Sequence, residues 1–224
     1  MSRPATLVIG ASRGLGLELV RQYLDEGRRV IATARDDAGL ARLRALGAEV
    51  LRCDVADPAS VSGLAWQLDG EALPLALYVA GVMRRPGATT PPTQQDFDAV
   101  MHANVLGAMQ VLPQVGPLVE AAGGVFGFLS SSMSLIGSVP GSNAWLYRTS
   151  KAALNMAVAA ARFDYPRAVL CTLDPGWVQT DMGGAQAPLT PEESVRGLRA
   201  VLASVTPADS GRLLHHDGRR AAHW

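Results

Sequence analysis

A tyrosine and a lysine lie four residues apart near the middle of the chain, at Tyr147 and Lys151. If the segment from Trp145 onward is helical, the two side chains share one face of that helix. An ammonium group beside a phenol favours the phenolate. Lowering a tyrosine pKa from about 10 to neutrality needs roughly three units, or about 4 kcal/mol. The pair therefore suits proton transfer, although the same spacing also arises by chance as a solvated pair.

The composition sets this lysine apart. Among 20 Lys plus Arg, Lys151 is the only lysine. A compact ammonium can donate to several oxygens and lie close under a ring, which a planar guanidinium cannot do. We therefore interpret position 151 as selected for chemistry.

A glycine-rich loop follows the first apolar run, and its residues are Gly10-Ala11-Ser12-Arg13-Gly14-Leu15-Gly16. Its spacing departs from G-x-G-x-x-G. However, the loop follows a strand-like run and opens a helical pattern, where free backbone N–H groups and the helix dipole attract a pyrophosphate. Glycines let a phosphate approach the backbone closely. The alternative is an ordinary glycine turn.

Charge near the second strand bears on the choice of cofactor. That strand ends in Arg35, and the glycine loop carries Arg13. Two guanidinium groups near one spot favour a 2′-phosphate, and therefore NADP(H) over NAD(H). Asp36 and Asp37 lie close by and argue the other way. Asp54, after the third strand, is placed to accept a hydrogen bond from an adenine amino group, or it caps the next turn.

Strand-like and helix-like segments alternate along the chain. Strands are predicted at 5–9, 29–35, 49–55, 75–79, 124–129, 168–173 and 211–214, with helices at 15–24, 37–46, 59–68, from 93, at 145–161 and from 190. Strands that are apolar throughout indicate a parallel sheet covered on both faces. The expectation is one α/β domain over residues 1–224, a doubly wound Rossmann-type sheet of about seven strands, with a short substrate loop near 181–190 hinged at Gly183-Gly184.

The long helix that Thr93 is expected to cap carries one apolar stripe. Its members are Phe97, Val100, Met101, Ala108, Val111, Leu112 and Val115. Asn104 falls on that stripe, where an amide must find a partner or cost free energy. It is either a core residue bonded to backbone or a residue at the base of a site. Pro113 is expected to bend or end the helix.

The bulk composition excludes several classes of protein. Hydrophobic content of 48% with 18% charged residues indicates a well-buried globule, and a formal net charge of zero suggests neither a nucleic-acid nor a membrane partner. Cys53 and Cys171 are expected to be buried and unbridged. The four histidines lack metal-binding spacing, so no metal is predicted. No signal peptide and no long apolar stretch is seen, which favours a cytoplasmic protein.

Several separated motifs together resemble one family across essentially the whole chain. They are Gly10 to Gly16, Asn104-Val-Leu-Gly107, the Ser130–Ser132 run, Tyr147-x-x-x-Lys151 and Pro175-Gly-Trp-Val-x-Thr180. In this order they resemble the short-chain dehydrogenase/reductase family. The serine run and the segments 147–155 and 175–184 further resemble its small carbonyl reductases of the C-factor and sniffer type.

The resemblance implies a nicotinamide cofactor and an Asn-Ser-Tyr-Lys tetrad. Tyr147 would protonate the carbonyl oxygen as hydride arrives, and Lys151 would lower its pKa and bind the nicotinamide ribose. Asn104 would hold a water that links Lys151 to solvent. The serine that bonds the substrate oxygen is Ser134 by the commoner spacing and Ser131 by the sniffer-like spacing, and we choose Ser131. Further cofactor contacts are expected from Val55, Ala80, Gly81, Pro175, Gly176, Val178 and Thr180.

The chain departs from the family after the fourth strand. The family's Asn-Asn-Ala-Gly is replaced by Tyr78-Val79-Ala80-Gly81. Neither Tyr78 nor Val79 can make the bonds of the lost amides, so packing is expected to stabilise this strand.

The leading hypothesis is an NADP(H)-dependent carbonyl reductase or alcohol dehydrogenase. An apolar or aromatic substrate is expected because the pocket would be lined by Met133, Trp145, Trp177 and Met182. The alternative is a dinucleotide-binding sensor or signalling protein with little turnover. The resemblance also suggests a homodimer or homotetramer.

Overall fold

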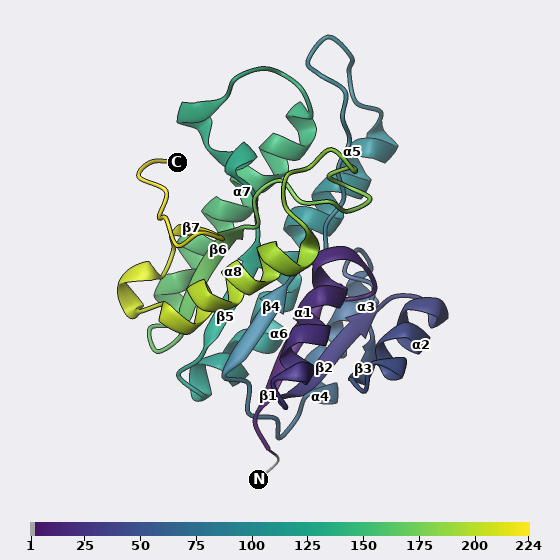
Figure 1. Ribbon diagram of the computed structural model, residues 1–224, viewed down its shortest axis with the longest axis vertical. Helices are drawn as coiled ribbons and strands as arrows, with labels where there is room; N and C mark the ends of the chain where they lie inside the picture. The colour runs from purple at the N-terminus through teal and green to yellow at the C-terminus, as the bar shows by residue number, and fades with distance from the viewer. Residues whose placement is uncertain (1–2) are drawn as a thin grey trace.

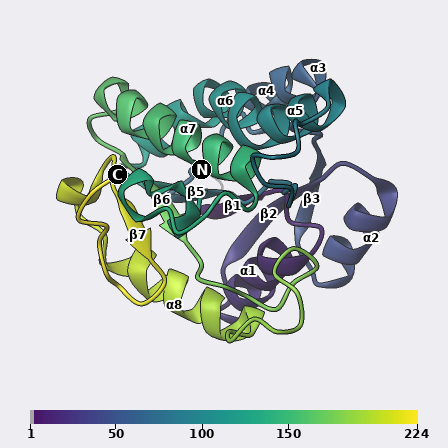
Figure 2. The same ribbon diagram turned by 90° about the horizontal axis from the view of Figure 1, so that it is seen from above.

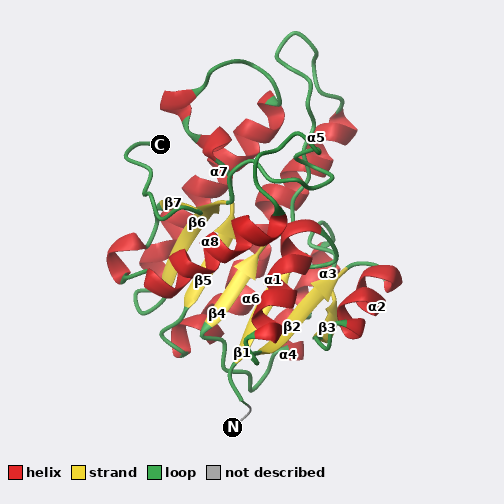
Figure 3. Cartoon of the chain, in the orientation of Figure 1, coloured by secondary structure: helices red, strands yellow, loops and turns green. Residues whose placement is uncertain are grey.

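A computed structural model describes residues 3–224 as one seven-stranded parallel sheet flanked by helices (Figures 1 and 3). The strands are β1 (Ala5–Ile9), β2 (Arg29–Ala34), β3 (Glu49–Arg52), β4 (Leu75–Tyr78), β5 (Val125–Leu129), β6 (Val169–Asp174) and β7 (Leu213–His215). Their order across the sheet is β3-β2-β1-β4-β5-β6-β7. All seven predicted strands exist, and the prediction of a doubly wound α/β fold is confirmed.

Helices cover both faces of the sheet (Figure 2). One layer holds α3 (Pro58–Ser62), α4 (Leu64–Gln67), α5 (Gln94–Met101), α6 (Gly107–Ala121) and α7 (Trp145–Ala161). The other holds α1 (Gly14–Asp25), α2 (Asp37–Ala45) and α8 (Pro191–Ser204). Short 3-10 turns at 132–134, 136–138, 162–164 and 207–209 were not predicted.

The sheet separates two apolar cores. Leu7 and Ile9 of β1 face the layer of α6 and α7, whereas Val8 faces α1, α2 and α8. All three side chains are fully buried. Successive strand residues point to opposite faces, so a strand buried on both sides must be apolar throughout, which is why these runs lack polar alternation. Cys53 and Cys171 are buried and unbridged, as predicted.

The third predicted helix is two helices. The sequence pattern runs through 59–68, but α3 ends at Ser62 and α4 starts at Leu64, with Gly63 between them. Asp57 caps α3 by accepting a hydrogen bond from the Ala59 N–H at 3.0 Å. Glycine lowers helix stability in the interior of a helix, so it marks the break.

The long helix is interrupted where the prediction had it continuous. Thr93 caps α5, as predicted, by accepting from the Asp96 N–H at 3.0 Å. A π-helical turn, His102–Leu106, then joins α5 to α6. Phe97 leaves the expected stripe, since it is 43% exposed.

Pro113 does not end this helix. Both Pro113 and Pro117 lie inside α6, which continues to Ala121. A proline in a helix removes one backbone donor. Here the buried stripe of Val111, Leu112, Val115 and Val119 packs the helix onto the sheet and keeps it intact.

Tyr78 corrects the expectation that packing alone stabilises β4. Its hydroxyl donates to the Ala103 carbonyl at 2.6 Å, inside the π-helical turn, and its ring is fully buried. The bond ties the carboxyl end of β4 to the residue before Asn104. A phenol therefore joins strand and helix at the place where the family carries amides.

The carboxyl ends of all the strands lie along one edge of the sheet. The long connections at 82–93, 130–144 and 175–190 rise beyond this edge in Figure 1. The strands that follow β1 are added on one side of it up to β3 and on its other side from β4 onward, and in parallel sheets ligands bind in the crevice outside the carboxyl ends of the strands at such a switch in strand order.

Candidate active site

Helix α7 brings the predicted tyrosine and lysine to the carboxyl end of β5. Its N-cap, Ala144, adopts a left-handed backbone with φ of 54°, and its N–H donates to the Arg85 carbonyl at 2.9 Å. From there Tyr147 and Lys151 turn inward, being 6% and 4% exposed. The Lys151 Nζ lies 5.6 Å from the centre of the Tyr147 ring, so the two side chains share a face as the spacing predicts.

Lys151 is held by backbone. Its Nζ donates to the Leu129 carbonyl at 2.7 Å, the last residue of β5. Burial disfavours the charged ammonium and lowers the pKa of Lys151 to about 7. A small shift of this pKa in either direction therefore decides whether Lys151 is charged near neutral pH.

The pKa of Tyr147 differs from the expectation. Burial raises it above its ordinary value, the negative charge of Asp174 raises it further, and a hydrogen bond with Ser131 lowers it. The expected lowering by Lys151 does not appear, because burial penalises the charged ammonium as well as the phenolate and leaves Lys151 neutral at the pH where the phenol would ionise. In this state Tyr147 is a neutral phenol that keeps its proton.

The two candidate serines occupy different environments. The Ser131 hydroxyl accepts from the Met133 N–H at 3.1 Å and forms the hydrogen bond with Tyr147. The Ser134 hydroxyl donates to the Ser131 carbonyl at 2.5 Å and accepts from Asn155 at 2.7 Å. Ser131 therefore faces the phenol, whereas Ser134 is committed to a buried network.

Asn104 is completely buried in the π-helical turn. Its Oδ1 accepts from the Val82 N–H at 2.8 Å, and its Nδ2 donates to the Val82 carbonyl and to the Ser150 hydroxyl, both at 2.9 Å. Its side chain is thus bonded to backbone and to α7, as the first of the two alternatives expected. It also lies at the base of the site, because a Cβ on Gly81 would stand 3.2 Å from its Oδ1 and 3.5 Å from the Lys151 Nζ.

The glycine loop is shaped by close backbone approach. Gly10 has a φ of 82°, and a Cβ there would meet the Ala80 backbone at 2.7 Å. Gly16 is as constrained, since its Cβ would lie 2.7 Å from the Gly10 carbonyl. No side chain caps α1, whose N-cap is Arg13, so the N–H groups of its first turn, at Gly14, Leu15 and Gly16, are left for another acceptor.

Three arginines approach the start of this loop and the end of β2. Arg13 is exposed and pairs with Asp181 at 3.3 Å, and Arg35 is exposed beside Asp36 at 3.9 Å. Arg42 of α2, which the sequence analysis missed, donates to the Ser12 carbonyl. Only the packing of α2 against the loop, where a Cβ on Gly39 would lie 2.8 Å from Ser12, brings it there.

The acidic residues at this corner are engaged elsewhere. Asp36 caps α2 by accepting from the Gly39 N–H at 2.7 Å, and Asp37 pairs with Arg52. Asp54 follows its second alternative and caps a turn, accepting from the Ala56 N–H at 3.0 Å. Val55, beside it, is buried.

The segment after β6, residues 175–190, is held in place by several contacts. The Pro175 carbonyl accepts from the Ser194 hydroxyl of α8 at 2.7 Å, and Gly176 takes a φ of 77°. Val178 is buried and pairs with Leu189 across the loop. The Thr180 hydroxyl accepts from the Gly183 N–H at 3.1 Å. The two ends of the 181–190 loop therefore lie side by side, because Val178 before the loop pairs with Leu189 near its end.

The predicted pocket residues lie on two of the connections above the sheet edge, 130–144 and 175–190, and at the first residue of α7. Met133, Trp145 and Met182 are half-buried, and Trp177 is exposed with its indole N–H donating to the Gly183 carbonyl at 2.8 Å. Arg85 reaches across to the Met182 carbonyl at 2.7 Å. The exposed Ile136 and Trp224 were not predicted, and the Gly137 N–H donates to the Trp224 carbonyl at 3.3 Å. The fold places the end of the chain beside the 130–144 connection, which no local sequence pattern could indicate.

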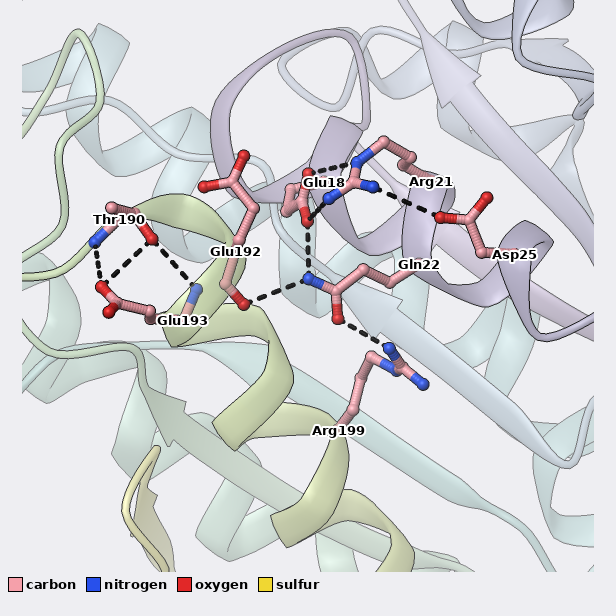
Figure 4. Close-up of polar contacts among 8 residues, drawn as sticks. All are labelled: Glu18, Arg21, Gln22, Asp25, Thr190, Glu192, Glu193 and Arg199. Carbon is pink, nitrogen blue, oxygen red and sulfur yellow. Dashed lines mark hydrogen bonds and ion pairs between the residues drawn. The ribbon is translucent and has the colours of Figure 1, made fainter.

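Helices α1 and α8 are tied together by a polar network (Figure 4). The buried Glu18 accepts from Arg21 and Gln22 of α1, and Gln22 also donates to the Glu192 carbonyl at 3.1 Å. Arg199 of α8 donates to Gln22 at 2.6 Å. The network ties α1, which follows the glycine loop, to α8, which follows the 181–190 loop.

A histidine and an aspartate lie behind the tyrosine. The His215 Nδ1 is 2.8 Å from the buried Asp174 Oδ2, and the two residues pair in register between β6 and β7. Asp174 also accepts from the Gly176 N–H at 3.3 Å. The sequence did not indicate this contact.

The described residues contain neither a metal-binding cluster nor a helix that could span a membrane. Within residues 3–224 no three His, Cys, Asp or Glu side chains gather to hold a metal ion. No helix in the same range is long and apolar enough to cross a membrane.

Comparison with known proteins identifies one family. The family model of the short chain dehydrogenases matches residues 4–189. The 1-hydroxy-2-glutathionyl-2-methyl-3-butene dehydrogenase of Rhodococcus sp. (strain AD45) is 33% identical over 95% of this chain and 96% of that protein. The C-signal protein of Myxococcus xanthus is 40% identical over 55% of this chain and 76% of that protein.

Solved structures show the same fold. The NADPH-bound carbonyl reductase from chicken fatty liver has a TM-score of 0.90 at 28% identity, with 100% of both chains covered. The carbonyl reductase Sniffer of D. melanogaster has a TM-score of 0.91 at 24% identity, also with 100% of both chains covered. With the C-signal match, these neighbours confirm the resemblance to C-factor and sniffer-like relatives.

Proposed function

The chain belongs to the short chain dehydrogenase family, and on that premise we propose that it is an NADP(H)-dependent oxidoreductase of the carbonyl reductase type. Hydride would move between the nicotinamide and the carbonyl or alcohol carbon of an apolar or aromatic substrate. One observation carries the proposal: Ser131, Tyr147 and Lys151 converge where β5 ends, with Tyr147 bonded to Ser131.

The residues present fit a dinucleotide. The first turn of α1 has no side-chain cap, and Gly10, Ala80 and Gly81 bring bare backbone close to one another and to Lys151. A pyrophosphate suits the N–H groups of such a helix start. We propose that residues 10, 12–16, 54–55, 80–81, 147, 151, 175–176, 178 and 180 hold the cofactor, which supplies or accepts the hydride.

The side chains of this site can supply the proton that carbonyl reduction needs. The raised pKa of Tyr147 keeps its proton in place until negative charge develops on the substrate oxygen. The Ser131 hydroxyl, bonded to that phenol, is placed to hold the same oxygen. Lys151, when charged, favours the phenolate left behind, and its pKa of about 7 lets it gain or lose that charge under ordinary conditions. Asn104 braces α7 through Ser150.

Turnover tests this proposal directly. The loss of NADPH absorbance is followed with a panel of apolar and aromatic aldehydes, ketones and quinones. Tyr147→Phe keeps the ring but removes the proton, so kcat is expected to fall by roughly 10²- to 10⁴-fold. Tyr165→Phe, outside the site, is the matched control and should retain full activity.

The alternative is a dinucleotide-binding sensor, which the C-signal relative favours by its name. NADPH binding without turnover on any compound of the panel would support it. Equal behaviour of wild type and Tyr147→Phe would support it as well.

The choice of NADP(H) rests on charge: Arg13 and Arg35 are exposed, each in an exposed ion pair, while Asp36 also caps α2 and Asp37 pairs with Arg52. The chicken carbonyl reductase that shares the fold carries NADPH. Arg35→Ala is expected to weaken NADPH binding by about tenfold or more and NADH binding little, because a charged contact to the 2′-phosphate is lost. Fluorescence titrations with both cofactors measure this, and an equal loss for both would refute the assignment.

A further inference from the structure

A third polar side chain lies on the same face of α7 as Tyr147 and Lys151. It is Asn155, which is 2% exposed. We propose that Asn155 is a positioning residue that holds Ser131 against Tyr147 for the reaction. This inference rests on the proposed function and deepens it.

The three residues lie at positions i, i+4 and i+8 of one helix, and each contacts the segment 129–134. Tyr147 bonds to the Ser131 hydroxyl, and the Lys151 Nζ donates to the Leu129 carbonyl at 2.7 Å. Asn155 completes the series by bonding to two serines of the same segment. One face of α7 therefore contacts residues 129, 130, 131 and 134 of this segment.

The bonds made by Asn155 lead to Ser131. The Ser130 hydroxyl donates to the Asn155 Oδ1 at 2.7 Å, and the Asn155 Nδ2 donates to the Ser134 hydroxyl at 2.7 Å. The Ser134 hydroxyl in turn donates a hydrogen bond to the Ser131 carbonyl at 2.5 Å. The amide therefore sets the direction of a chain of donors that ends on the residue bonded to Tyr147.

Burial makes this chain stiff. Ser130, Ser134 and Asn155 are each at most 3% exposed, so water cannot replace a lost partner without rearrangement. The backbone supports the turn as well, since the Ser134 N–H donates to the Ser131 carbonyl at 3.0 Å. Ser131 is thus held from its carbonyl side while its hydroxyl remains directed at the phenol.

Removing Asn155 is expected to loosen this hold. The Ser134 hydroxyl would then be free to turn away, and the Ser131 peptide could shift relative to the phenol. Small displacements of reacting groups reduce rates strongly. The hydrogen bond with Ser131 lowers the pKa of Tyr147, so weakening the bond should raise that pKa.

A double-mutant cycle tests the inference. Asn155→Ala is expected to lower kcat by about 10- to 100-fold with little change in KM for NADPH, because the cofactor contacts are untouched. In a Ser131→Ala background the same substitution should cause less than about a twofold further loss, since it acts through Ser131. The limb of the pH–rate profile that reports Tyr147 should move to higher pH in Asn155→Ala.

Two variants guard the test. Glu120→Ala removes the carboxylate that accepts from the Arg167 and Ala168 N–H groups at the opposite end of the sheet, and it should lower stability without changing kcat or the pH profile. Ser134→Ala breaks the chain with a smaller change, and it serves if Asn155→Ala does not fold. It should show the same non-additivity with Ser131→Ala.

The outcomes separate the two proposals. Turnover by wild type with additive losses in the cycle, or an unmoved pH profile, overturns the role of Asn155 alone. A larger loss in Ser134→Ala than in Ser131→Ala overturns it too, because Ser134 would then be the catalytic serine. No turnover by wild type overturns both the function and the positioning role.

Discussion

Lys151 is a buried amine whose charge the fold opposes. Among residues 3–224 its one hydrogen-bond acceptor is the Leu129 carbonyl, and burial lowers its pKa from 10.5 to about 7. The unfolded chain therefore binds more protons than the folded one between these two values. By linkage, the contribution of Lys151 to stability rises with pH through this window and is lost as the pH falls towards 7.

Lys151→Met tests this linkage. The variant removes the buried charge, so it should be more stable than wild type near pH 7. That advantage should shrink by up to about 1.4 kcal/mol per pH unit as the pH rises towards 10. Denaturant melts of both proteins across this range measure the difference, in which the other titrating groups cancel. A constant difference would contradict the lowered pKa.

At the residue scale the sequence predicted which groups meet but not their protonation. Spacing alone placed Tyr147 and Lys151 on one face. The direction of the Tyr147 shift depends on burial and on Asp174, which is distant in sequence and reaches the site only through β6. Asn155 was missed because an amide eight residues after the tyrosine looks like any helical polar residue.

At the element scale, β4 and the π-helical turn are joined by one hydroxyl. Tyr78 donates to the Ala103 carbonyl, next to Asn104, and burial raises the pKa of Tyr78, which keeps the donor protonated. The bond holds the π-helical turn close to the carboxyl end of β4. Gly107 explains why the approach is possible, because a Cβ there would lie 2.6 Å from this hydroxyl.

Tyr78→Phe should therefore destabilise the protein. The ring still fills its space, but the Ala103 carbonyl loses its side-chain partner, which costs about 1–3 kcal/mol in a buried position. Chemical denaturation measures the change. Tyr165→Phe is the matched control on a partly exposed ring, with an expected change within about 0.5 kcal/mol. Equal effects of the two substitutions would show that the Tyr78 hydroxyl contributes nothing.

The order of strands and helices was predictable, but their interruptions were not. Apolar runs and glycine punctuation indicated every strand, and Thr93 and Thr190 indicated two helix starts. The π-helical turn adds one residue to a turn, so the stripe predicted from Phe97 to Val115 does not continue across it, and no residue type marks the change. The break at Gly63 leaves the apolar pattern intact, and Pro113 does not end its helix because packing outweighs one missing donor.

At the scale of the molecule, the topology gathers residues far apart in sequence. Gly10, Ala80 and Ser131 follow β1, β4 and β5, Asp174 ends β6, and parallel pairing puts them along one edge. The sequence predicted this edge because parallel strands all end on it. It could not predict that Arg85, Ile136 and Trp224 border it, since long connections set their positions.

Helices α6 and α7 lie in the same layer over one face of the sheet (Figure 2), and each carries an exposed apolar side chain. Met109 is 53% exposed and Met156 is 70% exposed, which suits the homodimer or homotetramer that we predict. Met156→Glu should shift the protein to monomer in sedimentation experiments, because a charge would be buried between subunits. Trp66→Glu, on α4, is the control and should leave the assembly unchanged. A wild-type monomer would contradict this prediction.

The solitary status of Lys151 makes the chain unusual as a target for acylating reagents. With its Nζ enclosed between β5 and the tyrosine ring, the native protein offers such a reagent one lysine, and that lysine only when the site opens. A single mass increment on the peptide spanning residues 149–162 would then time the opening of the cleft, and a ligand seated there would protect it.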